Sequence, residues 1–163
     1  MADKIKVGIL GAGRALFMAR CRDAFPEDLV LAGIHDIRED RATSAAEMQG
    51  IGRVYSSYDD MLNDGAIDLV VIGTPDHEHA GQAIQAMKAG KHVLSEIPAA
   101  YEIAELEQLI ALEESQSLVY AMGNEVRWFS YLEAAKQMAI DGYWGDIFHS
   151  EAGYLHNLRR EGG

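Results

Sequence analysis

The feature that most constrains this chain is a regular alternation between short apolar runs and longer segments of helical period. Runs rich in β-branched residues occupy 5–10, 29–34, 69–72, 92–94 and 118–121. Runs that are apolar on both faces are typical of parallel strands covered by helices on each side. The segments 14–24, 38–49, 79–89 and 103–114 place apolar side chains three or four residues apart, which indicates helices. This order predicts right-handed βαβ crossovers and an α/β fold with a doubly wound parallel sheet.

A glycine pair stands between the first strand and the first helix. Gly11 permits a tight turn, and Gly13 has no Cβ, so a pyrophosphate can approach the backbone closely. The helix that follows offers N–H donors and a partial positive charge at its start. Leu16 stands at the third position of a G-x-G-x-x-G pattern, where a glycine serves helix–strand packing more than phosphate contact.

An acidic residue follows the second strand. A carboxylate at the position of Asp36 binds the ribose hydroxyls of adenosine and repels a 2′-phosphate. The order of strand, glycine loop, helix, strand and carboxylate therefore predicts a Rossmann-type dinucleotide-binding domain over residues 1–122, with NAD preferred to NADP. Arg38 leaves NADP open as an alternative, because a nearby arginine can accommodate the 2′-phosphate.

The pattern changes near Gly123. Residues 129–140 predict a helix, 142–146 a turn and 147–154 a strand, and the given sequence ends at 163. One helix and one strand cannot build a core of their own. We therefore expect residues 123–163 to be the beginning of an incomplete α+β second domain. The chain is then either a fragment or a natural short form.

Charge and composition narrow the partners. The chain carries 26 acidic and 14 basic side chains, a net charge of −12, which repels nucleic acid and anionic membranes. No signal peptide or membrane-spanning stretch is apparent, and Cys21 is the sole cysteine, so we expect a cytoplasmic protein with Cys21 buried.

We expect no metal site, since His77 and His79 lack further ligands at useful spacing.

A second pattern follows in residues 68–98. A strand ends in Thr74-Pro75, His79 lies four residues beyond the proline, Gly-Lys-His-Val occupies 90–93, and Glu-Ile-Pro occupies 96–98. This resembles the Gfo/Idh/MocA oxidoreductase family, from Ile5 to about Arg160. The resemblance implies a homo-oligomeric enzyme that oxidises or reduces a sugar, polyol or related hydroxy compound. Together with the glycine loop it gives these expected cofactor-binding residues: Gly11, Gly13, Arg14, Ala15, Leu16, Asp36, Arg38, Thr74, Pro75, His79, Glu96, Ile97 and Glu125.

Ile97 departs from the family pattern. The family usually carries a lysine here, near the reacting carbon and the nicotinamide, and an aliphatic side chain can neither stabilise an alkoxide nor relay a proton. For His79, a role as a packed, hydrogen-bonded histidine is at least as well supported as a functional one.

The strings at 96–100 and 149–159 resemble a branch that includes NAD-dependent α-N-acetylgalactosaminidases, and that branch also lacks the lysine. This resemblance makes Tyr154 and His156 the expected catalytic residues. Without it, the same residues would be the end of an amphipathic strand. The Asn124-Glu125 pair matches the branch inexactly, since the branch has Glu-Asn at this place.

Three functions follow from these patterns. The leading hypothesis is NAD-dependent oxidoreduction of a sugar, polyol or related hydroxy compound. The second is glycoside cleavage through transient oxidation, with NAD regenerated in each turnover. The third is a non-catalytic cofactor-binding or assembly module, which Ile97 and the incomplete second half favour.

Overall fold

The chain divides into two compact units, residues 1–124 and 125–163. The computed structural model describes residues 3–153, apart from the side chains of Met18, Glu125 and Arg127. The first unit holds the sheet and its helices, and the second holds two helical segments within residues 125–140. That the second unit begins a substrate domain stays a prediction.

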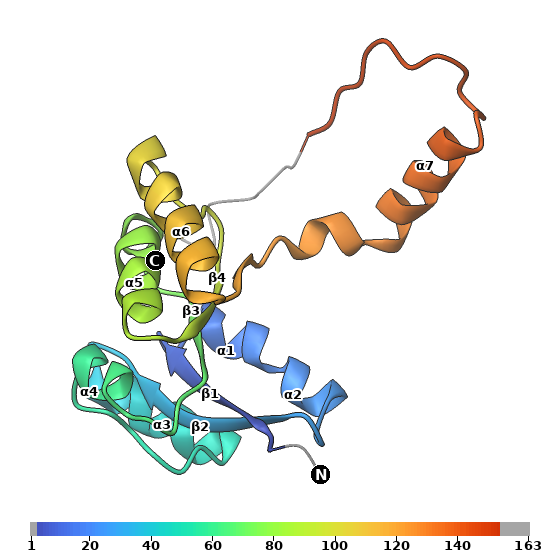
Figure 1. Ribbon diagram of the computed structural model, residues 1–163. Coiled ribbons are helices and arrows are strands. Elements are labelled where there is room, and N and C mark those ends of the chain that lie inside the picture. The colour runs from blue at the N-terminus through green and yellow to red at the C-terminus, as the bar shows by residue number, and fades with distance from the viewer. Residues whose placement is uncertain (1–2, 154–163) are drawn as a thin grey trace. The chain divides into compact units, whose positions relative to one another are not determined.

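The first unit is built on a parallel sheet with strand order β2-β1-β3-β4-β5 (Figure 1). The expected doubly wound α/β architecture is therefore confirmed. The order reverses between β1 and β3, and ligands of such sheets bind at the carboxyl ends of the strands beside this point. The strands are β1 (Ile5–Leu10), β2 (Leu29–His35), β3 (Leu69–Ile72), β4 (His92–Ser95) and β5 (Tyr120–Met122).

The helices follow the expected order, with two differences. The predicted helix over 14–24 is interrupted at Arg20, whose N–H bonds to the carbonyl of Phe17, three residues back. Cys21 therefore begins a separate turn and is exposed, whereas burial was expected. A short helix that the sequence did not predict, α4, is capped by the Ser57 side chain. The helices are α1 (Arg14–Ala19), α2 (Cys21–Ala24), α3 (Glu39–Gln49), α4 (Tyr58–Leu62), α5 (His79–Lys88) and α6 (Ile103–Gln116), with the 3-10 helix η1 (Asp76–Glu78) before α5.

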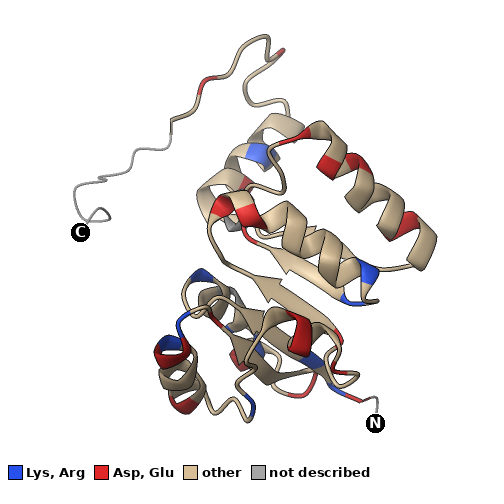
Figure 2. Cartoon of the chain, turned by 90° about the vertical axis from the view of Figure 1, so that its left-hand side faces the viewer, with Lys and Arg blue, Asp and Glu red and all other residues tan. Residues whose placement is uncertain are grey.

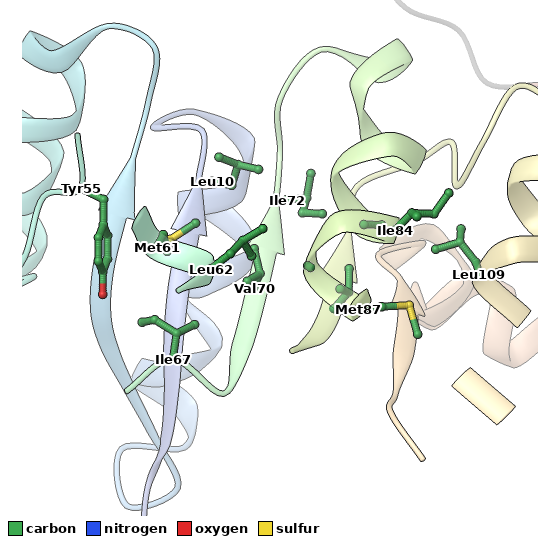
Figure 3. Close-up of a cluster of buried hydrophobic side chains, with 13 residues drawn as sticks. Leu10, Tyr55, Met61, Leu62, Ile67, Val70, Ile72, Ile84, Met87 and Leu109 are labelled. Atoms are coloured by element: carbon green, nitrogen blue, oxygen red, sulfur yellow. The ribbon is translucent and has the colours of Figure 1, made fainter. Parts of the chain in front are cut away.

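The sheet lies between two apolar layers, which explains why its central strands are apolar on both faces. On one face, alanines of α1 and α3 pack against Ile9, Ile34 and Val71. On the other face, α4, α5 and α6 contribute Met61, Leu62, Ile84, Met87 and Leu109 to a cluster with Val70 and Ile72 (Figure 3). The predicted apolar face of α5, namely Ala80, Ala83, Ile84 and Met87, is at most 8% exposed.

The second unit contains η2 (Glu125–Trp128) and α7 (Ser130–Ile140), and α7 buries none of its residues. The predicted strand over 147–154 is not formed within its described part, 147–153. A strand needs a neighbouring strand to pair its backbone N–H and C=O groups. The described residues of this unit offer none, so the alternating pattern has nothing to pair with.

The surface of the first unit is predominantly acidic, in keeping with the net charge of −12, and Figure 2 shows acidic residues spread along α6. Among the described residues, no helix is both long enough and apolar enough to cross a bilayer.

Candidate functional site

The loop between β1 and α1 is shaped by a close approach of two backbones. Gly11 has a φ of +94°, a conformation that favours glycine, and a Cβ there would lie 2.7 Å from the Gly73 carbonyl oxygen. Gly73 follows β3, and a Cβ on it would lie 2.2 Å from the backbone nitrogen of Ala15. The start of α1 therefore rests directly on the end of β3. Gly73 and the fully buried Ala15 provide the tight helix–strand packing that a third glycine at Leu16 would otherwise serve.

At Gly13, no neighbouring protein atom would clash with an added Cβ. It is exposed, and the nearest atom to an added Cβ is Nη2 of Arg41, 3.5 Å away. The missing side chain instead leaves the backbone at the start of α1 open to an approaching ligand. Arg41 lies in the first turn of α3, and its proximity to this loop was not foreseen from the sequence. The signal was weak: a cation five residues after Asp36.

Asp36 joins the end of β2 to the glycine loop. Its Oδ2 accepts a hydrogen bond from the Ala12 N–H at 2.8 Å, and its Oδ1 accepts one from the Arg38 N–H at 2.9 Å. A carboxylate oxygen has a second lone pair, so each can still accept from a ribose hydroxyl. The Arg38 guanidinium instead pairs with Asp40 at 3.3 Å, and both side chains are mostly exposed. Their pairing lowers the pKa of Asp40.

A pocket opens beside Asp36 at the carboxyl edge of β2. Two tyrosines contribute to its wall: the Tyr55 hydroxyl donates to Asp64 at 2.7 Å, and the Tyr58 hydroxyl donates to the Gln82 carbonyl at 2.8 Å. Burial and the Asp64 carboxylate raise the pKa of Tyr55 to about 12. The pocket has the polar and aromatic walls that could hold a planar base. Its lining is His35, Asp36, Ile37, Glu39, Thr43, Val54, Tyr55, Ser56, Ser57 and Tyr58.

The loop after β4 is tied to the glycine loop by an ion pair. Glu96 is 5% exposed, and its Oε1 accepts from Nε of Arg14 at 2.7 Å, across a large separation in sequence. Its Oε2 accepts from the Ile97 N–H at 3.0 Å. The Ile97 side chain is 47% exposed, and the Ile97–Pro98 peptide bond is cis.

His79 lies behind the loops that follow β3 and β4. It is the first residue of α5 and is 1% exposed. Its Nε2 lies 2.9 Å from the Thr74 carbonyl oxygen, and its Nδ1 lies 3.1 Å from the Pro98 carbonyl oxygen. The Thr74 hydroxyl donates to the Gln82 side chain at 2.6 Å. The histidine is therefore packed and hydrogen-bonded, and it contacts the loops from the buried side.

The structure brings most of the expected cofactor-binding residues to one edge of the sheet, at the carboxyl ends of β1 to β4. Leu16 differs, since it packs on the apolar layer formed with α1 and α3. Glu125 belongs to the second unit, and its side chain lies outside the described part. Tyr154 and His156 also lie outside the described residues. Among the described residues, no group of three or more His, Cys, Asp or Glu side chains is placed to hold a metal ion.

Comparisons with known proteins identify the family of the first unit. Residues 5–124 match the GFO_IDH_MocA family, described as "Oxidoreductase family, NAD-binding Rossmann fold". A glycosyl hydrolase family 109 protein of Shewanella sp. (strain W3-18-1) is 31% identical over 96% of this chain. The chain spans 36% of the length of that relative.

Two solved structures that share the fold are more than 25% identical in sequence to this chain. The scyllo-inositol dehydrogenase of Lactobacillus casei, solved with NAD(H) and scyllo-inositol, superposes with a TM-score of 0.78 at 29% identity, over 89% of this chain and 43% of that one. A levoglucosan dehydrogenase in complex with NADH and levoglucosan gives 0.77 at 27% identity, over 89% and 41%. The glycine loop, the carboxylate after β2 and the match over residues 5–124 agree, and the chain belongs to the Gfo/Idh/MocA oxidoreductase family with an NAD-binding Rossmann fold.

Proposed function

We propose that this chain binds NAD(H) for redox chemistry at a carbinol carbon of a sugar, polyol or related hydroxy compound. The observation that carries the proposal is the Asp36 carboxylate, bonded to the Ala12 N–H beside the open backbone of Gly13. In this binding mode the pyrophosphate lies over residues 11–14, and the adenosine ribose donates its hydroxyls to Asp36. The adenine then lies toward the pocket formed with Tyr55 and Tyr58.

The nicotinamide would lie on the other side of the switch point. With strand order β2-β1-β3-β4-β5, a dinucleotide whose adenosine is over β2 extends toward the ends of β3 and β4. The turns at Thr74-Pro75 and Glu96-Ile97 would then flank it. Bound NAD would supply the hydride acceptor. Glu96 holds Arg14 beside the glycine loop, and Ile97 offers an apolar surface without a proton to exchange.

Tyr154 and His156 are the proposed residues that handle the substrate proton. Their assignment rests on the resemblance of residues 149–159 to the α-N-acetylgalactosaminidase branch. The homo-oligomeric state and the sugar or polyol substrate are proposals on the same ground. They are supported by relatives whose structures contain scyllo-inositol or levoglucosan with the cofactor.

Glycoside cleavage through transient oxidation is the second candidate. Two observations favour it: Ile97 stands where the dehydrogenases of the family usually carry lysine, and the chain is 31% identical to glycosyl hydrolase family 109 proteins. In such a reaction the hydride returns to the sugar, so NAD is restored after each turnover. A cofactor-binding or assembly role without turnover is the third.

One set of measurements separates the three candidates. Calorimetry of the purified chain with NAD⁺ and NADH tests the cofactor, and absence of binding to both would overturn the proposal. The chain is then incubated with NAD⁺ and either a panel of sugars and polyols or aryl α-N-acetylgalactosaminides. Net NADH indicates a dehydrogenase, and aryl alcohol release without net NADH indicates a glycosidase. NAD binding with neither product indicates the binding module.

A further inference from the structure

We propose that His79 is a positioning residue that clasps the loops after β3 and β4 together and so sets the width of the nicotinamide side of the site. The inference rests on the proposed NAD binding and goes beyond it, because His79 is 1% exposed and acts on the site through the two loops that it contacts. Its two ring nitrogens face one carbonyl on each loop, Thr74 at 2.9 Å and Pro98 at 3.1 Å.

The two loops need a connection because the backbone pairing between β3 and β4 ends before them. The strands β3 and β4 are paired up to Ile72 and Ser95, and the Glu96 N–H donates to the Ile72 carbonyl. Beyond that bond the two chains leave the sheet and run as loops. His79 connects them two residues further along each loop, from the buried side, where the ring is 1% exposed.

The two loops expose side chains to solvent and direct backbone carbonyls at the buried histidine. Pro75 and Ile97 are exposed, while the Thr74 and Pro98 carbonyls are directed at the buried ring. The contacts of the His79 ring with both carbonyls therefore constrain how far apart the loops that carry Pro75 and Ile97 can lie. In the proposed binding mode these two residues flank the nicotinamide, whereas Gly13 and Asp36 hold the other half of the cofactor.

The chemistry of the ring suits this task. A carbonyl oxygen only accepts, so a neutral imidazole donates to one of the two carbonyls and a protonated one donates to both. Phenylalanine has a similar ring but no N–H, so His79→Phe removes the hydrogen-bond donor between the two loops with little change in volume. Asparagine places its amide nitrogen near the position of Nδ1, so His79→Asn can keep the bond to Pro98.

The test compares two ligands on the full chain. ADP engages the proposed glycine-loop and Asp36 half alone, and NAD⁺ engages both halves. Calorimetry should show that His79→Phe weakens NAD⁺ binding about tenfold, the equivalent of about one hydrogen bond, and changes ADP binding less than about twofold. His79→Asn should recover part of the NAD⁺ affinity. The matched control is His77→Phe, because the His77 side chain is 72% exposed in the same segment, and it should change neither affinity.

The outcomes are distinct. Equal loss of ADP and NAD⁺ affinity in His79→Phe, with urea unfolding showing a folded variant, would make His79 a general structural residue and overturn the clasp. Unchanged NAD⁺ affinity would overturn it as well. If His79→Phe does not fold, the ratio of NAD⁺ to ADP affinity in His79→Asn decides, since the clasp requires that ratio to fall below that of the wild type. A wild-type chain that binds neither ligand would instead overturn the proposed function.

Discussion

At the scale of single residues, Glu96 and Arg14 show how the site can hold a buried charge. Glu96 is a carboxylate that is 5% exposed, and a buried charge without a partner is strongly destabilising. It accepts from Arg14 and from the Ile97 N–H, so both of its oxygens are satisfied. The Arg14 side chain is 62% exposed, so solvent screens the pair and its contribution to stability is modest. The main effect of the Arg14–Glu96 pair is geometric, because the pair fixes the loop after β4 against the glycine loop.

Gly13 gives the sharpest residue-scale prediction. Gly13→Val should abolish NAD⁺ binding, because the new side chain occupies the space over which the pyrophosphate would lie. The fold should persist, since an added Cβ meets nothing closer than Arg41 at 3.5 Å. Calorimetry measures the affinity and circular dichroism the fold. Gly52→Val is the control, as a Cβ at Gly52 meets nothing within 4 Å and Gly52 is not part of the glycine loop. Unchanged affinity in Gly13→Val would remove the pyrophosphate from this loop.

The cofactor preference is a second residue-scale prediction. NAD⁺ should bind more tightly than NADP⁺ by about 1–3 kcal/mol, because the 2′-phosphate would meet the Asp36 carboxylate and leave it poorly paired. Competition calorimetry on wild type and on Asp36→Asn measures the difference, which should shrink in the variant. Arg38→Ala should leave the preference in place, since the Arg38 guanidinium pairs with Asp40. Equal affinities in the wild type would show that Arg38 dominates the pocket.

Candidate site residues could be predicted from the sequence where the chemistry of a single residue suggests its role. Gly11, Gly13 and Asp36 were identified because a missing Cβ and a carboxylate after a strand have a meaning that needs no partner. The Arg14–Glu96 pair and the contact between Gly73 and Ala15 were not foreseen, because each joins residues that are distant in sequence and meet only in the folded sheet. Arg41 was missed for the same reason.

At the scale of elements, prediction succeeded where burial dictates the pattern. The strands at 5–10 and 69–72 were expected at the bounds they have, since residues 7–10 and 70–72 are buried on both faces. The helix α4 was missed because five residues are too few to show a helical period. The strand expected at 147–154 is absent from the described part, 147–153, because alternation alone does not supply a pairing partner.

The contact between α1 and β3 gives an element-scale prediction. Gly73→Ala should destabilise the fold by about 1–3 kcal/mol or more, because the methyl group would force the backbones of β3 and α1 apart. Gly81→Ala, a matched substitution at an exposed position of α5 where an added Cβ meets nothing within 4 Å, should stabilise it by about 0.5–1 kcal/mol. Urea unfolding measures both. A Gly73→Ala variant as stable as the wild type or more stable would show that the close approach at Gly73 does not constrain the fold.

At the scale of the whole molecule, apolar surface is uncovered in each unit. In the first unit the edge strand β5 leaves Met122 44% exposed. In the second unit Phe148 is 98% exposed, and Trp128, Tyr131, Ile140 and Ile147 are each more than half exposed. Isolated apolar residues on a surface are ordinary, but among the described residues of this unit α7 buries none of its side chains, so this part of the unit has no core to hold it. Such a unit gains stability when something else covers it.

We therefore predict that the purified 163-residue chain either self-associates through residues 125–153 or leaves them loosely packed. It should also show weak or no dehydrogenase turnover with NAD bound, because Ile97 offers no proton relay. Light scattering measures the mass in solution, and NADH formation with sugars and polyols measures turnover. If association occurs, Phe148→Ser should weaken it, while Met48→Ser, at a position 72% exposed on α3, should not. A monomer with a protease-resistant second unit and ordinary turnover would contradict both parts. Tyr154 and His156 would then have to complete an active site within this chain, and substitution of either would be the direct way to find it.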